Sequence, residues 1–357
     1  MKNITQITTV FSLLIICNSY SQNTVDPNNT IEEKTIFTVL EENGKTKYFG
    51  QFYKNKKKGI GTEFLENGKI RTGYFENDEF LGEFIVNPPW HIIDIDYFFR
   101  TDILFDELSV DLIIKNEIST DEFLYIAPFC GNINGIGFYA GIQSKTGGYI
   151  NTDHNEEKAD YHEIGKAMIF SRWETRNINA LQKATNGVCE SSGYEGDFIS
   201  VRNRLEWETG KYTLSLKNTH ETVEIEGIPH TFVEFKCYDH QKDSSFKCGS
   251  LAFPGEQLSL DKSNYIFVEL YSKLTKISDT PKGSISVGNF KYIKPGSEFK
   301  SRIQPSSAFA LYDVNSPQWA RSWHKERMFH IQFGEPYVRE YTYEYDSFYL
   351  ETLKRSE

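Results

Sequence analysis

The sequence lacks long apolar stretches after its first residues, and its basic residues are outnumbered by acidic ones. A membrane-spanning helix takes about 20 apolar residues, and no segment beyond residue 21 offers them, so we predict no membrane span. Lys and Arg number 39 against 50 Asp and Glu, which gives a formal net charge of −11. Because nucleic acids and anionic membrane surfaces are themselves negative, we expect neither as a partner.

Signatures of several enzyme classes are absent too. The chain has no His-Glu-x-x-His, no Gly-x-Ser-x-Gly and no phosphate-binding loop, and its eight histidines show no metal-like spacing. Residues 151–157 carry oxygen-bearing side chains at alternate positions, as a calcium loop does, but lack the central glycine that such a loop needs. We interpret them as a solvated acidic loop, and we predict no metal and no cofactor.

The first residues are typical of a secretory signal peptide. Lys2 precedes an apolar run at 10–17, and small residues stand at the first and third positions before a cut after residue 21. We therefore predict a signal peptide over residues 1–21 and a secreted or periplasmic mature chain. Lipidation of Cys17 is the alternative, although the bulky Ile16 precedes it where a small residue is required.

Four cysteines follow the predicted cut, and an even number in an exported chain favours disulfides. Cys237 and Cys248 lie symmetrically about a polar turn between two strand-like runs, so a hairpin centred on residues 242–243 predicts a bond between them. Cys130 and Cys189 are then the remaining pair. Four free thiols are the alternative.

Short runs of β-branched and aromatic residues dominate the chain, alternating with Gly, Asn and Asp turns. This spacing, without a convincing helical period, predicts an all-β fold: a large antiparallel β-sandwich, jelly-roll-like, with an N-terminal β-hairpin segment. The expected divisions are a flexible leader at 22–34, hairpin repeats at 35–87, the sandwich at 88–349 and a charged tail at 350–357.

The hairpin segment contains an internal repeat with an offset of 23 residues. Residues 50–52, Gly-Gln-Phe, recur as Gly-Tyr-Phe at 73–75, and Gly59 recurs as Gly82. Together with the aromatic pair at 48–49, this pattern resembles the MORN repeat, whose members form stacked β-hairpins and in some cases contact proteins or lipids. The basic run within residues 54–58 is either a binding patch or a solvated loop.

Four stretches in the second region resemble a family of secreted bacterial sandwich proteins known only as a domain of unknown function. The first is 137–144, with Gly-Ile-Gln at 141–143, and the second is 168–174, with Phe-Ser-Arg-Trp at 170–173. The third is 193–197, with Tyr-Glu-Gly at 194–196, running on to Trp-Glu-Thr-Gly-Lys-Tyr at 207–212, and the fourth and weaker is 248–255, followed by Phe-Val-Glu at 267–269. The resemblance covers about residues 90–300 and implies export and a β-sandwich, with no assigned activity. Tyr194 stands where the family has Gly.

Three aromatic side chains in these stretches have faces suited to stacking on sugar rings, and three polar ones are suited to sugar hydroxyls. We therefore predict ligand binding by these six residues: Tyr139, Trp173, Trp207, Gln143, Arg172 and Glu195. The alternative places both tryptophans in the sandwich core.

The leading functional hypothesis is an exported, non-catalytic module that binds a glycan or a cell-surface partner. A carbohydrate-active enzyme, lyase or hydrolase, is the alternative, with Glu195 and Glu174 as first candidates for catalytic carboxylates. A structural envelope protein acting through the repeat segment is a third hypothesis.

Overall fold

The computed structural model describes residues 36–151, 160–271, 275–313, 315–339, 345–348 and 350, all within one compact unit, Lys34–Glu357. The predicted signal peptide, the leader, most of loop 151–157 and most of the tail lie outside the described residues. Two single-turn 3-10 helices, η1 (Ile178–Ala180) and η2 (Ile277–Asp279), are the helical elements of the described part. Across the described residues, no helix has the length and apolar character needed to cross a membrane.

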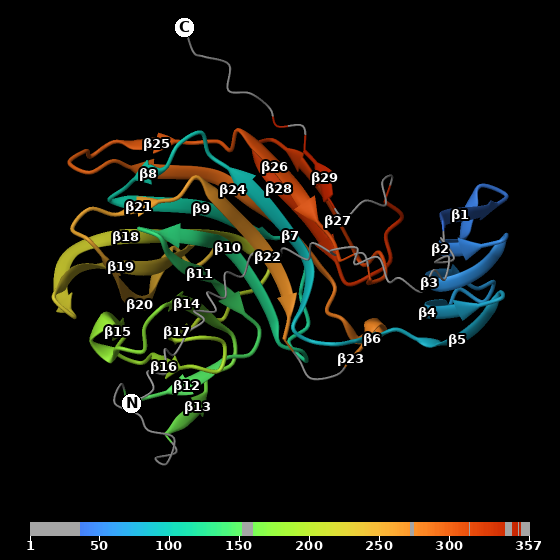
Figure 1. The fold of residues 1–357 in the computed structure, drawn as a ribbon, viewed down its shortest axis with the longest axis horizontal. Helices are drawn as coiled ribbons and strands as arrows, with labels where there is room; N and C mark the ends of the chain where they lie inside the picture. Colours follow the sequence, from blue (N-terminus) through green and yellow to red (C-terminus); the bar gives the residue numbers. More distant parts are fainter. Residues whose placement is uncertain are drawn as a thin grey trace, which may run out of the picture. The chain divides into compact units, whose positions relative to one another are not determined.

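The larger of two extended sheets contains 13 antiparallel strands (Figure 1). Its order is β13 (Tyr161–Glu163), β12 (Gly147–Tyr149), β16 (Val188–Ser192), β17 (Phe198–Arg204), β14 (Ala167–Trp173), β11 (Ile136–Gln143), β10 (Leu124–Ile133), β22 (Ser263–Leu270), β7 (Trp90–Phe98), β26 (Ser307–Leu311) and β29 (Tyr345–Ser347). The short strand β21 (Ser259–Leu260) also pairs with β10, and β8 (Ile103–Leu104) pairs with β21.

The second sheet has nine antiparallel strands. Its order is β15 (Leu181–Lys183), β20 (Ser244–Pro254), β19 (Ile228–Asp239), β18 (Gly210–Ile225), β9 (Glu107–Ile114), β24 (Gly283–Ile293), β28 (Met328–Phe333) and β27 (Ala320–Lys325), with β25 (Lys300–Arg302) paired to β24.

One hydrophobic core joins the inner faces of these two sheets. Phe170 on β14 stacks on Phe253 of β20, with ring centroids 6.1 Å apart, and Phe138 on β11 meets the same ring edge-on. Along each strand, core residues alternate with residues that point the other way, because successive β side chains point to opposite faces. The architecture confirms the predicted all-β antiparallel sandwich.

A separate five-stranded meander precedes the sandwich, formed by β1 (Ile36–Glu42), β2 (Lys45–Tyr53), β3 (Lys56–Phe64), β4 (Ile70–Glu76) and β5 (Glu79–Glu83). The repeated glycines allow close packing of the strands: a Cβ on Gly50 would lie 2.4 Å from the Gly61 Cα. Next along the chain, β6 (Ile85–Val86) pairs with β23 (Thr275–Lys276). The resemblance of the meander to MORN repeats stays a prediction.

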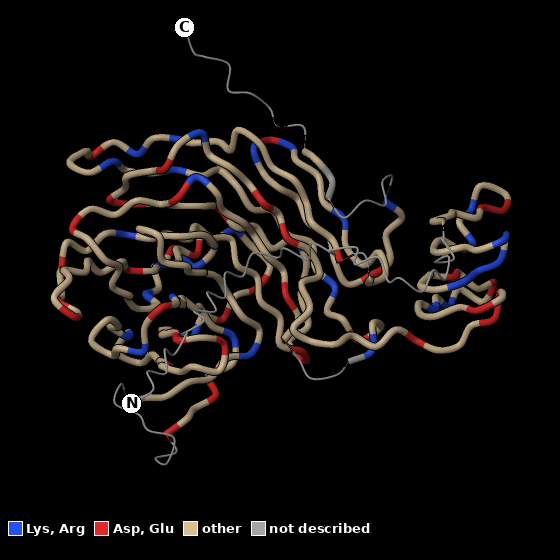
Figure 2. The backbone as a smooth tube through the Cα atoms, viewed as in Figure 1, with Lys and Arg blue, Asp and Glu red and all other residues tan. Residues whose placement is uncertain are grey.

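The basic run of the meander is visible as a blue segment along β3 (Figure 2). Lys57 forms an ion pair with Glu63 and lies 4.9 Å from the centre of the Tyr48 ring, and Lys58 is 3.7 Å from a Glu76 carboxylate oxygen. These lysines therefore have partners within the meander itself, which favours the solvated hairpin over a binding patch.

Neither predicted disulfide is present, because all four cysteines are free and buried. The hairpin of β19 and β20 closes where Asp239 pairs with Ser244, and the Asp239 carboxylate accepts the backbone N–H of Gln241 at 2.9 Å. This turn is centred one residue earlier than we expected, so Cys237 pairs with Phe246 instead of Cys248.

The second predicted pair is excluded by the order of strands. Cys130 lies on β10 and Cys189 on β16, with β11, β14 and β17 between them. Four strand spacings amount to roughly 19 Å, far beyond the reach of a disulfide. Both pairings are therefore wrong.

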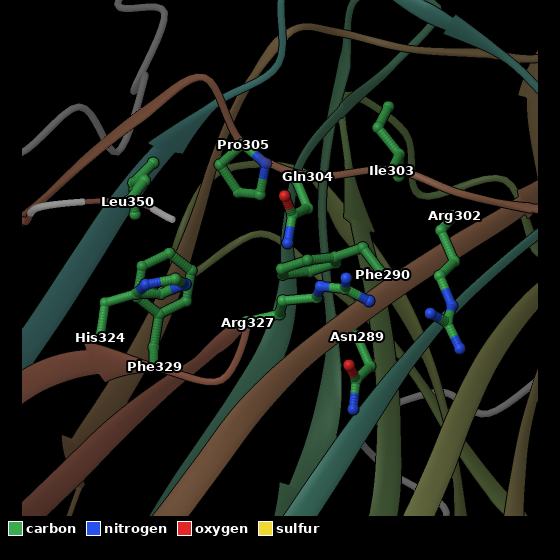
Figure 3. Close-up of a pocket in the computed structure, with 10 residues that line it drawn as sticks. All are labelled: Asn289, Phe290, Arg302, Ile303, Gln304, Pro305, His324, Arg327, Phe329 and Leu350. Carbon is green, nitrogen blue, oxygen red and sulfur yellow. The ribbon is translucent and has the colours of Figure 1, made fainter. Parts of the chain in front are cut away.

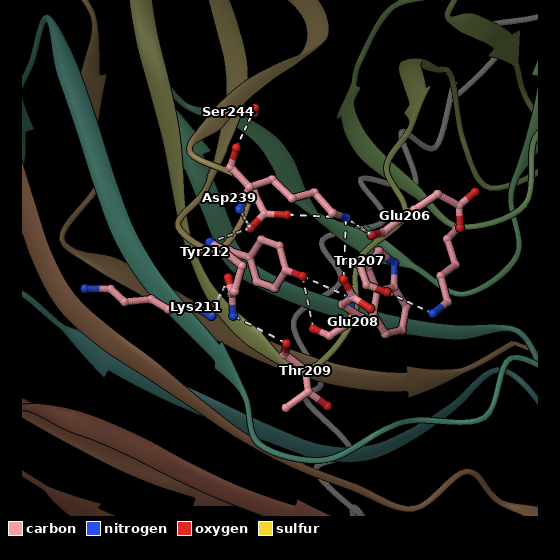
Figure 4. Close-up of polar contacts among 11 residues, drawn as sticks. Glu206, Trp207, Glu208, Thr209, Lys211, Tyr212, Asp239 and Ser244 are labelled. Atoms are coloured by element: carbon pink, nitrogen blue, oxygen red, sulfur yellow. Dashed lines mark hydrogen bonds and ion pairs between the residues drawn. The ribbon is translucent and has the colours of Figure 1, made fainter.

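The stretch that ends in Tyr212 forms a corner at the start of β18 (Figure 4). The Tyr212 hydroxyl donates to the Glu208 carbonyl at 3.0 Å and accepts the Glu208 N–H at 2.9 Å. Gly210 between them leaves room for the Gln241 side chain to pack against the corner. This tyrosine corner, a feature of β-sandwiches, gives the Trp-x-x-Gly-x-Tyr pattern a structural role.

Candidate functional site

The face of the 13-stranded sheet turned away from the core carries an unusual set of polar and aromatic side chains. We call it the outer face. Its central side chains alternate with core residues on the same strands, and they are His91, Asp94, Asp96, Tyr125, Cys130, Tyr139, Gln143, Trp173, Glu190, Ser200, Arg202, Tyr265, Phe267 and Glu269. Cross-strand pairing aligns them in rows across the sheet, one of which runs from His91 through Glu269 and Tyr125 to Gln143.

Three of the six predicted ligand residues meet on this face. The rings of Tyr139 and Trp173 lie 5.4 Å apart at 52°, and the Trp173 indole N–H donates to the Glu195 carbonyl at 3.3 Å. Gln143 is on the same face and its side chain is buried. It pairs with Ala167 at the start of β14, whereas Trp173 is at the end of that strand. The structure thus brings Tyr139, Trp173 and Glu195 together.

The other two predicted residues lie in the interior, and their predicted ligand contact is wrong. Trp207 is 1 % exposed, and its indole N–H donates to the Gln143 carbonyl at 2.9 Å. Arg172 precedes Trp173 on β14 and therefore points to the opposite face, where it donates to the Ala252 carbonyl of the second sheet. Burial lowers the pKa of the Arg172 guanidinium to about 10.

Glu195 occupies a tight turn between β16 and β17. Gly196 supplies the left-handed conformation of this turn with φ of 85°. The Tyr271 hydroxyl donates to Glu195 Oε1 at 2.7 Å. Burial raises the pKa of the Glu195 carboxyl, and the nearby Glu269 and Glu190 raise it further, against the opposing effects of Tyr271 and Arg202.

Arg202, and not Arg172, is the arginine of the outer face. It forms an ion pair with Glu190 on the neighbouring strand and donates to the Gly147 carbonyl. Burial by itself lowers the pKa of Arg202, but Glu190 and Tyr139 more than reverse that effect and raise it above its ordinary value. The alternation of Ile199 and Val201 with Ser200 and Arg202 is the sequence signal that could have identified this residue.

A second group of charges lies on β7 and β22. His91 Nδ1 is 2.7 Å from an Asp94 carboxylate oxygen, and His91 Nε2 is 3.5 Å from Glu269. Burial lowers the pKa of His91, yet the two carboxylates raise it well above its ordinary value, so the ring is a cation at neutral pH. Burial, together with the charge of Asp94, raises the pKa of Asp96 to about 7.

Among the buried polar groups of the outer face without a hydrogen-bond partner in the described part of the chain are the Gln143 amide nitrogen and the Ser200 hydroxyl. Gln143 Oε1 accepts from Thr146 at 2.6 Å, so only its N–H₂ donors remain unused. An unpaired buried polar group costs roughly 1–3 kcal/mol, which makes both groups candidates for ligand contact.

Further aromatic side chains lie on or beside this face, and Tyr125, Tyr271 and Tyr194 were not among the predicted ligand residues. Tyr125 stacks on Tyr271 with ring centroids 5.8 Å apart at 20°, and Tyr271 is 38 % exposed. Tyr194, beside Glu195, is 64 % exposed and meets Phe198 edge-on. The residue that departs from the family pattern is thus an aromatic group on the surface next to the site.

Metal binding finds no support in the described residues. No group of three or more His, Cys, Asp or Glu side chains in that part of the chain is arranged to hold a metal ion. Of the loop considered for calcium, Asn151 is described and residues 152–157 lie outside the described residues.

A small pocket lies beside a bulge of β24, a strand of the second sheet (Figure 3). Arg302 and Arg327 line it together with the aromatic rings of Phe290 and Phe329. Asn289 takes a left-handed conformation with φ of 53°, and its amide donates to Asp111 at 3.3 Å. None of the residues predicted to bind a ligand lines this pocket.

Comparison with known proteins gives structural likeness only. No protein-family model matches the sequence, and no curated protein sequence matches it. Scytalido-glutamic peptidase with a peptide-based transition-state analogue aligns at 8 % identity and a TM-score of 0.34, covering 68 % of this chain and 98 % of that one. The same peptidase with another transition-state analogue inhibitor gives 6 % identity and a TM-score of 0.33, covering 67 % and 98 %. SCP-B, of the Eqolisin family of peptidases, in complex with the tripeptide Ala-Ile-His gives 8 % identity and a TM-score of 0.29, covering 68 % of this chain and 98 % of that one. At TM-scores this low, the likeness supports no conclusion about activity.

Proposed function

We propose that this protein is an exported, non-catalytic module that binds a glycan on its outer face. The observation that carries the proposal is the meeting of Tyr139, Trp173 and Glu195, which come from three separate segments. Aromatic rings with adjacent carboxylates and amides are a common means of holding sugar rings and their hydroxyls.

The test is a glycan-array screen of the purified mature protein, followed by calorimetry on each hit. Trp173→Ala is expected to reduce affinity at least tenfold, because it removes the ring that packs on Tyr139. Trp323→Ala is the matched control, because Trp323 is an exposed tryptophan on the second sheet. Equal affinities of both variants and the unmodified protein, or silence on the array, would overturn the proposal.

A carbohydrate-active enzyme is the second candidate, favoured by the raised pKa of Glu195. A raised pKa favours the protonated form of a carboxyl, and this is the form that acts as a general acid in glycosidic cleavage. Glu174, the other candidate carboxylate, is exposed just after β14 in a left-handed conformation with φ of 65°. Release of new reducing ends that stops in Glu195→Gln, with binding retained, would establish this alternative.

A further inference from the structure

The outer face carries more negative than positive charge. Five carboxylates lie on it or at its edge: Asp94, Asp96, Glu190, Glu195 and Glu269. The cations beside them are His91 and Arg202. Both cations are already engaged, since Arg202 pairs with Glu190 and His91 lies between Asp94 and Glu269.

Two carboxyls consequently have no ion pair with a cation in the described part of the chain, namely Asp96 and Glu195. The Glu195 carboxylate has only the neutral Tyr271 hydroxyl as a hydrogen-bond donor. Asp96 lies half-buried on β7 between two aromatic cross-strand neighbours, Tyr265 on β22 and Phe309 on β26. A carboxylate flanked by rings suits an organic cation, which gains from both the charge and the ring faces.

The unpartnered Gln143 amide and Ser200 hydroxyl are an independent sign that this face takes a ligand. Both side chains are at most 2 % exposed, and both alternate with the core residues Ile142 and Val201, so they point to the outer face. Gln143 shares a cross-strand row with Tyr125 and Glu269, and Ser200 pairs directly with Glu190. Both groups can form hydrogen bonds with the hydroxyl and ring oxygens of a sugar.

We infer that the glycan taken by the outer face contains amino sugars with a free, protonated amine. Asp96 and Glu195 are the two carboxyls without an ion-pair partner, and a bound ammonium group would favour their ionised form by supplying the missing positive charge, while the aromatic rings pack on the sugar faces. A glycan rich in uronic acid or sulfate would add negative charge to a face that already has an excess of it, and is disfavoured. This inference rests on the proposed glycan-binding function.

The experiment compares two hexasaccharides with the same backbone, a glucosamine hexamer and its fully N-acetylated counterpart, by calorimetry at pH 7 with the mature protein. The glucosamine hexamer is expected to bind at least tenfold more tightly. Asp96→Asn and Glu195→Gln are each expected to reduce that preference at least threefold. Glu224→Gln, which removes an exposed charge on β18 of the second sheet, controls for non-specific attraction and should leave the preference unchanged.

The outcomes separate this inference from the proposed function. Equal or tighter binding of the N-acetylated hexamer, or of another neutral glycan on the array, overturns the amine preference while glycan binding stands. An equal loss in all three variants shows attraction to the acidic protein as a whole and also overturns it. Absence of binding to every glycan overturns both. Circular dichroism of each variant verifies its fold, and a variant that unfolds is replaced by Tyr271→Phe, which removes only the hydroxyl donor to Glu195.

Discussion

At the scale of single residues, the outer face holds carboxyl groups in two different electrostatic situations. Asp94 and Glu190 have a cation within ion-pair distance, whereas Asp96 sits beside the like charge of Asp94. Burial and a neighbouring carboxylate both favour the protonated form, and for this reason the pKa of Asp96 rises to about 7. Because folding raises the pKa of this carboxyl, the free energy of unfolding falls as the pH rises and the carboxyl loses its proton.

We expect Asp96→Asn to stabilise the protein, and to do so more at high pH. The folded pKa lies above the ordinary value of 3.8, so the wild-type protein loses stability as pH rises from about 4 to 7, and Asn has no proton to lose. The gain in free energy of unfolding should be roughly 1–2 kcal/mol larger at pH 8 than at pH 5, with partial exposure taken into account. Urea unfolding at both pH values measures it, with Glu224→Gln as the control. A gain that does not change with pH would contradict the assigned pKa.

At the scale of elements, the corner before β18 fixes how the chain enters the second sheet. The Tyr212 hydroxyl satisfies both backbone groups of Glu208, and the ring is buried in the core. Lys242 and Gln241, from the turn between β19 and β20, reach back to the Glu206 and Thr209 carbonyls at 3.0 and 3.3 Å. The corner before β18 and the turn between β19 and β20 are therefore tied to each other (Figure 4).

Tyr212→Phe should lower the free energy of unfolding by about 1–3 kcal/mol, because the Glu208 N–H and carbonyl then lose their partner. Tyr238→Phe is the matched control, since its hydroxyl bonds the exposed Asp243 on the surface of the hairpin and its loss should lower the free energy of unfolding much less than Tyr212→Phe does. Urea denaturation of both variants and the unmodified protein measures the two changes in the free energy of unfolding. Similar effects in the two variants would show that the corner contributes little.

The same elements show where sequence reasoning succeeds and where it fails. Alternating runs of β-branched and aromatic residues are local features, and they were enough to predict the antiparallel sandwich. Which of two adjacent residues faces the core is not local: Arg172 and Trp173 differ by one position, and only the placement of the second sheet shows that Arg172 is the inner one. The cysteine pairing failed for a related reason, because a turn displaced by one residue pairs Cys237 with Phe246.

The candidate site was predicted in part for the same physical reasons. Tyr139, Trp173 and Glu195 carry recognisable motifs, whereas Arg202, Tyr271 and the charged group on β7 come from segments with no motif. Their convergence depends on the order of strands in the sheet, which places β22 beside β10 and β7 beside β22. Local sequence does not determine that order.

At the scale of the whole molecule, the two sheets are held together by packing and hydrogen bonds without disulfides in the described residues. The Cys248 thiol, for example, donates to the Val201 carbonyl of the opposite sheet at 3.3 Å. Burial raises the pKa of the Cys189 thiol to about 11 and that of Cys237 to about 12, so few thiolates form at neutral pH.

All four thiols should therefore resist iodoacetamide in the folded mature protein and react fully once it is unfolded. Mass spectrometry after denaturation without reductant is expected to show four adducts on the residues Cys130, Cys189, Cys237 and Cys248. Two disulfides would give none without reductant and four with it. That result would restore the cysteine pairing expected from the sequence and contradict the structure.

The contact between the Trp173 indole and the Glu195 carbonyl also gives the protein an optical reporter. Of the five tryptophans, Trp90, Trp207 and Trp319 are buried and Trp323 lies on the second sheet, so Trp173 alone stands on the outer face. A saccharide that settles on this ring displaces water from it and shifts its emission to shorter wavelength. Occupancy of the face can thus be followed by intrinsic fluorescence, without a label and at micromolar protein.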